Sequence, residues 1–390
     1  MKNRVLITLL SVFFALCGQA LLAQSNSDRL NTIHTVVPFL TIAPDSRAGG
    51  MGDVGIATSP DVFSSHWNAA KLAFIGNNSG VGISYLPWLR SLVNDINIAL
   101  LTGFIRIDEK QVISSRLLYS SLGDIQFNDD FGNLLRNFTP NEFALDAAYS
   151  RLFSEKLSGA VAFRFIHSNL SGGIYSSGGV ATKNGISYAA DISGFWNNDI
   201  SIMEKNANIA VGIAFSNIGS KMSYSDSHSS FIPMNMGIGS ALKIDIDNYN
   251  SITFALDLNK LLVPTPPIYS PSSRDSIIAG KNDNVSVPVA IFQSFYDAPG
   301  GFKEEIREIT YSAGVEYWYS NIFALRGGYF HEHENKGNRR YFTAGAGFKL
   351  NSFILDFSYL LPVVQNHPLA KTLRFSLAFD IGGNNIKSGA

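Results

Sequence analysis

Apolar and polar residues alternate along most of the chain after residue 78, which puts successive side chains on opposite faces of an extended backbone. Near the C-terminus, Leu373, Phe375 and Leu377 alternate with Arg374 and Ser376. Most such stretches reach the nine to eleven residues or so that a tilted strand needs to cross a membrane. The pattern predicts fourteen strands, at residues 79–87, 94–106, 111–120, 142–153, 157–168, 184–196, 207–217, 232–246, 250–258, 307–319, 322–331, 339–350, 352–361 and 371–381.

The lengths of the connections decide between a soluble sandwich and a membrane barrel, because alternation fits both. Even-numbered connections are short, as at residues 107–110, 154–156 and 320–321, whereas most odd-numbered ones are longer, as at 121–141 and 259–306. Short turns at one end and long loops at the other are typical of outer-membrane barrels, and only a closed sheet pairs every backbone group in lipid. We therefore predict an all-β fold, a fourteen-stranded antiparallel transmembrane β-barrel over residues 79–390, with both ends on the periplasmic side.

The first 23 residues have the layout of a secretory signal peptide, with Lys2 and Arg4 before an apolar stretch and small residues up to Ala23. We expect cleavage after Ala23 and export to the cell outer membrane. The only cysteine, Cys17, lies in this segment, so the mature chain would have no disulfide or thiol chemistry. The chain carries only 16% charged residues and a formal net charge of −1, which gives no argument for a nucleic-acid partner.

Charged residues on the polar faces of the strands would line the lumen if the apolar faces point to lipid. With four bases and six acids, we expect ion pairs across the lumen that hold the interior together. The alternative is a polar permeation path, which we favour less. These lumen charges are Arg116, Asp146, Arg164, Asp191, Asp257, Glu316, Arg326, Asp356, Arg374 and Asp380. Trp88, Trp196 and Trp318 fall at strand ends, where they suit the aromatic girdles of a membrane barrel.

Other local motifs give little support for chemistry. His331 and His333 share a face of an extended segment and could reach one metal ion, but they lie in a predicted outer loop where charged and polar residues are ordinary. Residues 225–228 place serine beside acid and histidine, yet adjacency in sequence is not the geometry of a catalytic triad. We expect no cofactor, no bound metal and no enzymatic activity.

The long connection at residues 259–306 differs in kind from the others, because it combines six prolines with many apolar residues. A loop of this length is usually functional or disordered, and Pro-rich extended backbone offers unpaired groups to a partner. We expect this loop to contact cargo or a partner. The less favoured alternatives are a lid on the lumen and disorder. The contact residues would be Ile268, Tyr269, Phe292, Phe295 and Tyr296.

The N-terminal segment at residues 24–78 is irregular and rich in glycine, and we expect it to form a hatch-like element in or near the lumen. The stretches 46–55 and 65–71 resemble the start of the FadL-like family of outer-membrane proteins, and within it the PorV family of the type IX secretion system of Bacteroidetes. Ala69 stands where the wider family commonly has proline. The hatch motif comprises Arg47, Gly49, Gly52, Asp53, Trp67 and Asn68.

That resemblance implies a non-catalytic barrel that binds the C-terminal signal domains of secreted cargo arriving through a large outer-membrane translocon barrel. The barrel would then deliver the cargo to a cell-surface attachment complex containing a sortase-like protease. Outer-membrane lipids would surround it. The alternatives are a FadL-type transporter of hydrophobic small molecules, which predicts an apolar lumenal pocket, and a lipopolysaccharide deacylase, which predicts Ser, His and Asp meeting at the outer rim. A general porin is disfavoured by the hatch-like segment.

Overall fold

A computed structural model describes residues 30–128, 131–170, 172, 182–226, 228–271, 273–365 and 367–383 of the chain. The predicted signal peptide, residues 1–23, lies outside the described residues. None of the helices in the described ranges is long and apolar enough to cross a membrane.

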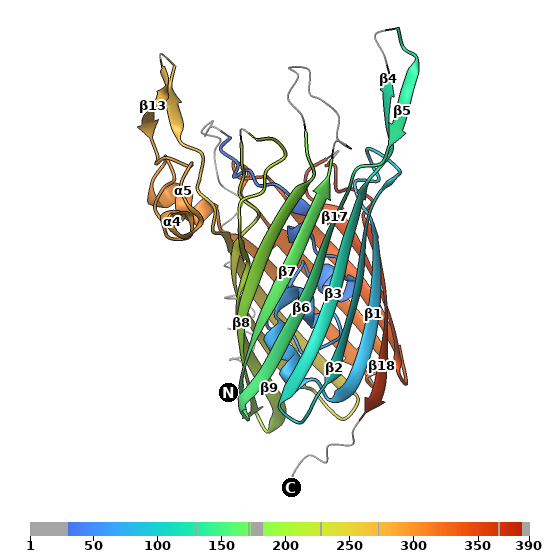
Figure 1. Cartoon of the computed structure of the whole chain (residues 1–390). Helices are drawn as coiled ribbons and strands as arrows, with labels where there is room; N and C mark the ends of the chain where they lie inside the picture. Colours follow the sequence, from blue (N-terminus) through green and yellow to red (C-terminus); the bar gives the residue numbers. More distant parts are fainter. Residues whose placement is uncertain are drawn as a thin grey trace.

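Fourteen strands form a closed antiparallel barrel in which β1 pairs with β18 (Figure 1). The number of strands and their alternation, both predicted from the sequence, are confirmed. The barrel strands are β1 (Asn77–Pro87), β2 (Ile96–Arg106), β3 (Gln111–Leu122), β6 (Asn141–Ser154), β7 (Leu157–Asn169), β8 (Gly185–Ile202), β9 (Lys205–Gly219), β10 (Asn235–Asp245), β11 (Asn250–Leu261), β14 (Thr310–Tyr319), β15 (Phe323–His331), β16 (Arg340–Leu350), β17 (Phe353–Pro362) and β18 (Leu373–Gly383).

The register turns apolar side chains outward and small or polar ones inward. On β1, Ile83 and Tyr85 are 52% and 47% exposed, whereas Ser84 between them is 1% exposed. An outward apolar band is what a bilayer requires of a barrel. Of the tryptophans expected in aromatic girdles, Trp196 shares the outward face with Ile192. The prediction is wrong for Trp318, which shares the inward face of β14 with Glu316, and for Trp88, which packs against buried apolar clusters.

The segment before β1 fills the lumen. It contains η2 (Pro38–Thr41), α2 (Ser46–Gly50), α3 (Ser64–Trp67) and η3 (Ala69–Phe74). Helix α2 contacts β15–β18 and η3 contacts β6–β8, so the segment reaches opposite walls of the barrel (Figure 1). We call residues 30–43 the strap and residues 44–76 the plug.

The barrel sheet begins and ends at its short-turn end, which is the periplasmic end of such barrels. The described chain nevertheless begins at the opposite, extracellular end, because the Asn31 backbone N–H donates to the Asn335 carbonyl in the β15–β16 loop at 3.0 Å. The expectation that both ends lie on the periplasmic side is therefore wrong for the described N-terminus. The segment traverses the lumen before β1, and a strand count takes no account of such a passage.

Two extracellular connections carry structure of their own. A hairpin of β4 (Ile125–Asn128) and β5 (Leu134–Phe138) projects between β3 and β6. Residues 262–309, which we call the loop module, contain β12 (Ile268–Ser270), β13 (Ser273–Ala279), α4 (Val287–Gln293) and α5 (Phe302–Arg307). The expected extended Pro-rich loop is therefore wrong. In Figure 1 the module stands beside and above the extracellular rim.

Candidate functional site

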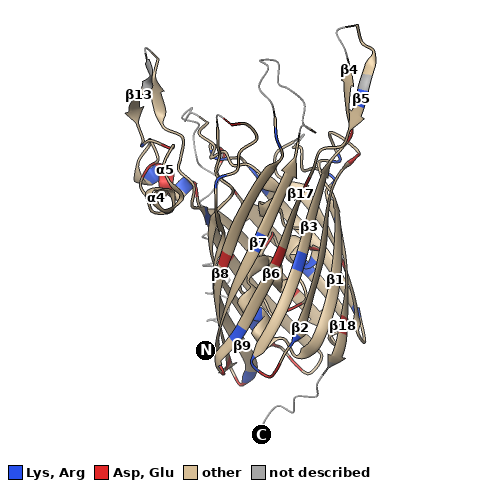
Figure 2. Cartoon of the chain, viewed as in Figure 1, with Lys and Arg blue, Asp and Glu red and all other residues tan. Residues whose placement is uncertain are grey.

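One group of lumen charges, the wall cluster, lies entirely on adjacent strands. Asp146 on β6 is directly opposite Arg116 on β3 and Arg164 on β7, and it hydrogen-bonds to both (Figure 2). The Arg164 guanidinium also lies 2.6 Å from Asp191 on β8, at a bulge where Asp191 accepts from the Asn217 N–H at 2.7 Å. The expected pairs across the lumen are wrong here, because pairing follows the cross-strand register.

A second group, the plug cluster, joins the wall to the plug. Arg47 of α2 contacts Glu316 on β14 at 2.8 Å and Asp61 of the plug at 2.7 Å. Arg326 on β15 contacts the same Glu316 at 2.7 Å and Asp356 on β17 at 2.6 Å. Glu316 is 1% exposed and is held by one arginine from the plug and one from the wall. Removing the plug would leave Glu316 with a single partner.

Three further plug residues contact the wall, one through its side chain and two through their backbone. Asp53 lies 3.2 Å from Arg374 on β18 and accepts a hydrogen bond from Tyr341 at 2.5 Å. Gly52 has a φ of +71°, and a Cβ there would lie 2.6 Å from the Tyr329 backbone nitrogen. The Gly49 carbonyl accepts from Arg374 at 3.2 Å. Glycine at position 52 is thus required both by the left-handed backbone and by the close approach to β15.

The remaining hatch-motif residues, Trp67 and Asn68, fix the centre of the plug. The Trp67 ring covers Gly55, and a Cβ at Gly55 would lie 2.2 Å from that ring. The Asn68 side chain donates to the Ile56 carbonyl at 3.1 Å. Asp257 on β11 accepts the backbone N–H groups of Gly55 and Ile56 at 2.7 and 2.9 Å. Asp257 therefore binds plug backbone, where the sequence predicted a lumen ion pair.

Two lumen residues fall outside these clusters. Asp380 on β18 is partly buried next to Gly80 of β1 and belongs to neither cluster. Lys71 of η3, which sequence reasoning missed, is 1% exposed and donates to the Gly55 carbonyl at 2.6 Å and to Thr58 at 3.0 Å. The irregular plug gives no periodicity from which its burial could have been predicted.

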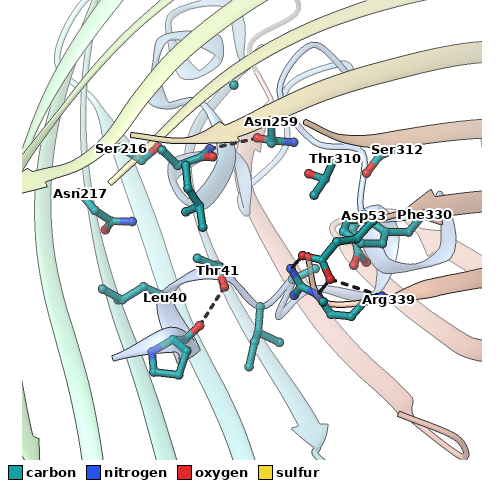
Figure 3. Close-up of a pocket in the computed structure, with 18 of the residues that line it drawn as sticks. Leu40, Thr41, Asp53, Ser216, Asn217, Asn259, Thr310, Ser312, Phe330 and Arg339 are labelled. Atoms are coloured by element: carbon teal, nitrogen blue, oxygen red, sulfur yellow. Dashed lines mark hydrogen bonds and ion pairs between the residues drawn. The ribbon is translucent and has the colours of Figure 1, made fainter. Parts of the chain in front are cut away.

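A cavity of about 400 Å³ lies between the strap and the plug (Figure 3). Leu40 and Thr41 of the strap line one side of it, and Asp53 of the plug lines another. Much of its wall is amide, hydroxyl and guanidinium, and Asn235 donates to Asn259 at 3.0 Å. Its polar wall residues include Asn217, Asn235, Asn259, Thr310, Ser312 and Arg339. Apolar side chains such as Leu40, Trp88 and Phe330 line the rest of the cavity, so its wall is mixed in character.

The loop module holds aromatic side chains out in solvent. Of the predicted contact residues, Phe292 is 72% exposed and Tyr296 is 59% exposed, while Phe295 and Tyr269 are 44% and 43% exposed. Ile268 is partly buried. On the other side of α4, Val285, Val287 and Ile291 pack against the apolar cluster beneath the outer loops. The module thus has a packed inner side and an exposed apolar outer side.

A buried ionic network, the rim network, attaches α5 to the barrel. Lys260 on β11 lies 3.1 Å from Glu305 and 2.7 Å from Glu308. Lys336 of the β15–β16 loop lies 2.9 Å from Glu308 and 2.6 Å from Glu304. Sequence reasoning missed these residues, because they come from three separate stretches of the chain.

The rim network also adjoins a perturbed acid in the loop module. Burial, together with the nearby Glu305 and Glu308 carboxylates, raises the pKa of Asp297 to about 6. Asp297 accepts hydrogen bonds from the Gln293 side chain at 3.2 Å and the Thr265 N–H at 3.3 Å.

The other sequence motifs form neither a metal site nor a catalytic triad in the described part of the chain. The His331 ring stacks on Tyr311 with centroids 4.9 Å apart. Within the described residues, no group of three or more His, Cys, Asp or Glu side chains is arranged to hold a metal ion. Asp226 forms an exposed ion pair with Lys183 at 2.7 Å, and residue 227 lies outside the described residues.

Comparison with known proteins gives a family and a fold. Residues 24–268 match the family described as Type IX secretion system protein PorV. No curated protein matches the chain. A solved structure of a TodX mutant, described as a monoaromatic hydrocarbon channel, is 11% identical, with 87% of this chain and 98% of that one covered and a TM-score of 0.50. The toluene transporter TodX of Pseudomonas putida is 11% identical, with coverages of 90% and 98% and a TM-score of 0.47.

The likeness to the TodX mutant concerns the fold alone, since so low an identity carries no information about substrate. The family match covers more than half of the chain and agrees with the outer-membrane barrel described above. The chain belongs to the PorV family of type IX secretion system proteins.

Proposed function

We propose that this barrel is a non-catalytic carrier that binds the C-terminal signal domains of secreted cargo and moves them across the outer surface of the membrane. It would receive cargo from the large translocon barrel and deliver it to the attachment complex with the sortase-like protease. The exposed aromatic side of the loop module carries the proposal, together with membership of a type IX secretion family. The outward apolar band would contact outer-membrane lipids.

The loop module suits protein recognition for physical reasons. Phe292, Phe295 and Tyr296 would each remove a large apolar area from water on contact with a partner. The rim network and the packed side of α4 hold these rings in place before binding, which lowers the entropy lost on association. The β4–β5 hairpin offers a second contact, because Phe131 and Leu134 are 90% and 56% exposed.

The lumen favours this function over transport of hydrophobic molecules. The plug occupies the lumen and binds the wall through Arg47, Asp53 and the backbone of Gly55. A hydrophobic solute crossing this interior would displace hydrogen bonds that it cannot replace.

The test is co-purification of cargo with loop-module variants from the native outer membrane. Replacing Phe292 and Tyr296 with serine should lower recovery of proteins that carry the C-terminal signal domain by about tenfold, since exposed aromatic residues are common hot spots. The matched control is Leu92→Ser, because Leu92 is also well exposed, at 64%, but lies in the short β1–β2 loop. Equal recovery from both variants, or fatty acids bound in the lumen with no cargo, would refute the proposal.

A further inference from the structure

The strap begins among the extracellular loops. Leu30 is 71% exposed, and the next residue, Asn31, donates its backbone N–H to Asn335 in the β15–β16 loop. Five residues later, the Val36 N–H donates to the Phe231 carbonyl in the β9–β10 loop at 3.0 Å. Both acceptors lie in long loops, so residues 30–36 run across the extracellular mouth of the barrel.

A side-chain contact ties the strap to the loop module. The Asn31 amide donates to the Pro266 carbonyl at 3.2 Å and to the Glu304 carboxylate at 3.0 Å. Glu304 belongs to α5 and also contacts Lys336 of the rim network. The position of the strap therefore depends on the position of α5.

The strap continues directly into the plug. Val37 and Phe39 are 1% and 2% exposed and belong to the same buried apolar cluster as Leu86 and Ile98, which are paired near the extracellular ends of β1 and β2. Only residues 44 and 45 separate the strap from α2, whose Arg47 belongs to the plug cluster. Because so few residues separate residues 30–36 from the plug cluster, a displacement of the strap would also move the plug.

We propose that residues 30–36 are displayed at the cell surface and act as an extracellular latch on the lumenal plug. Asn31 holds the latch closed against the loop module, so a protein that docks on α5 and shifts it also frees the strap. The strap covers the cavity, and its release opens that cavity from outside. The display and the latch do not depend on which protein docks, so cargo binding can fail without affecting either.

Cysteine labelling of intact cells tests the display. In a Cys17→Ser background, Leu30→Cys introduces a thiol at an exposed site of the strap. Met203→Cys is the matched control, because Met203 is 62% exposed in the tight β8–β9 turn at the periplasmic end. A membrane-impermeant maleimide should label Leu30→Cys on intact cells and label Met203→Cys only after the membrane is permeabilised. A Leu30→Cys thiol that also needs permeabilisation would overturn the proposal.

The latch is tested with a thiol in the cavity, at Ser312→Cys, because Ser312 lines the cavity from β14 and is only 1% exposed. Adding Asn31→Ala removes both side-chain hydrogen bonds to the module and should speed labelling of that thiol about fivefold, as the loss of partly buried hydrogen bonds predicts. Thr32→Ala is the matched control, because the Thr32 hydroxyl shares its hydrogen bond with His34 of the strap itself. Heat-modifiable mobility on gels checks that each variant is folded. Equal labelling rates in the Asn31→Ala and Thr32→Ala variants would overturn the latch.

Discussion

The lumen and the loop module are built in opposite ways. In the lumen, charged side chains such as Asp146 and Glu316 are at least 96% buried, and each has a charged partner within hydrogen-bonding distance. In the loop module, which faces water, Phe292 and Tyr296 are mostly exposed. Buried paired charges resist separation, because a lone charge in a low-dielectric interior is costly. Exposed aromatic rings lower the free energy when another surface covers them. Under the proposed function, the lumen would be the closed part of the molecule and the loop module its recognition surface.

The largest expected effect comes from breaking the wall cluster with Asp146→Ala. Arg116 would lose its carboxylate partner while 3% exposed, whereas Arg164 would keep Asp191. The free energy of unfolding should fall by about 3–5 kcal/mol, measured by denaturant unfolding in lipid vesicles. The double variant Arg116→Met with Asp146→Ala should recover part of the loss. A loss below about 1 kcal/mol would show that the wall cluster does not stabilise the lumen.

A smaller effect is expected inside the plug, from Gly52→Ala. The added methyl group would meet the Tyr329 backbone in a left-handed conformation that alanine disfavours. The fit of the plug to the wall should lose about 1–3 kcal/mol of stability, seen as faster labelling of the Ser312→Cys thiol in the cavity. Gly76→Ala is the control, because a Cβ at Gly76 meets nothing within 4 Å. If the two variants label equally, the fit of plug to wall does not hold the plug in place.

The smallest effect is a pH dependence of the loop module through Asp297. Burial raises the pKa of this carboxyl from 3.8 to about 6. A raised pKa means that its contribution to stability is complete below its ordinary pKa and is lost as pH rises through about 6. The local stability of the module should be lower at pH 7.5 than at pH 5 by about 1 kcal/mol or less after solvent screening. Limited proteolysis of the module, corrected with a reference peptide, should therefore be faster at pH 7.5. Asp297→Asn should abolish the difference, and a persisting difference would assign it to another group.

The strands of the barrel and the directions of their side chains could largely be predicted from the local sequence pattern. The contacts inside the lumen could not. Arg116 and Asp146 sit on the polar side of an alternation, so their inward direction could be predicted from the sequence. Trp318 was assigned to a girdle by residue type, although it shares the parity of Glu316 and faces inward over Arg326, whose guanidinium lies 5.6 Å from its ring. The position of Trp318 in the alternation predicts its direction better than its residue type does, because successive side chains of a strand point to opposite faces.

The plug and the loop module needed the structure for different reasons. The ion pair of Arg47 with Glu316 joins residues 269 positions apart, and nothing local to either specifies the other. Helix α4 did have a signal, since Val287, Ala290 and Ile291 recur at helical spacing, but the prolines around it favoured an extended reading. The rim network combines Lys260, Glu308 and Lys336 from three stretches, which only the folded chain brings together.

The most direct test of the central claim is the affinity of the purified barrel for an isolated C-terminal signal domain of a secreted protein. Binding would be compared among the unchanged chain, the Phe292→Ser and Tyr296→Ser double variant, and the Gly52→Ala plug variant. Recognition by the loop module predicts that the double variant loses about tenfold or more in affinity, while the plug variant binds as the unchanged chain does. Unchanged binding by the double variant, or binding lost only when the plug is loosened, would contradict it.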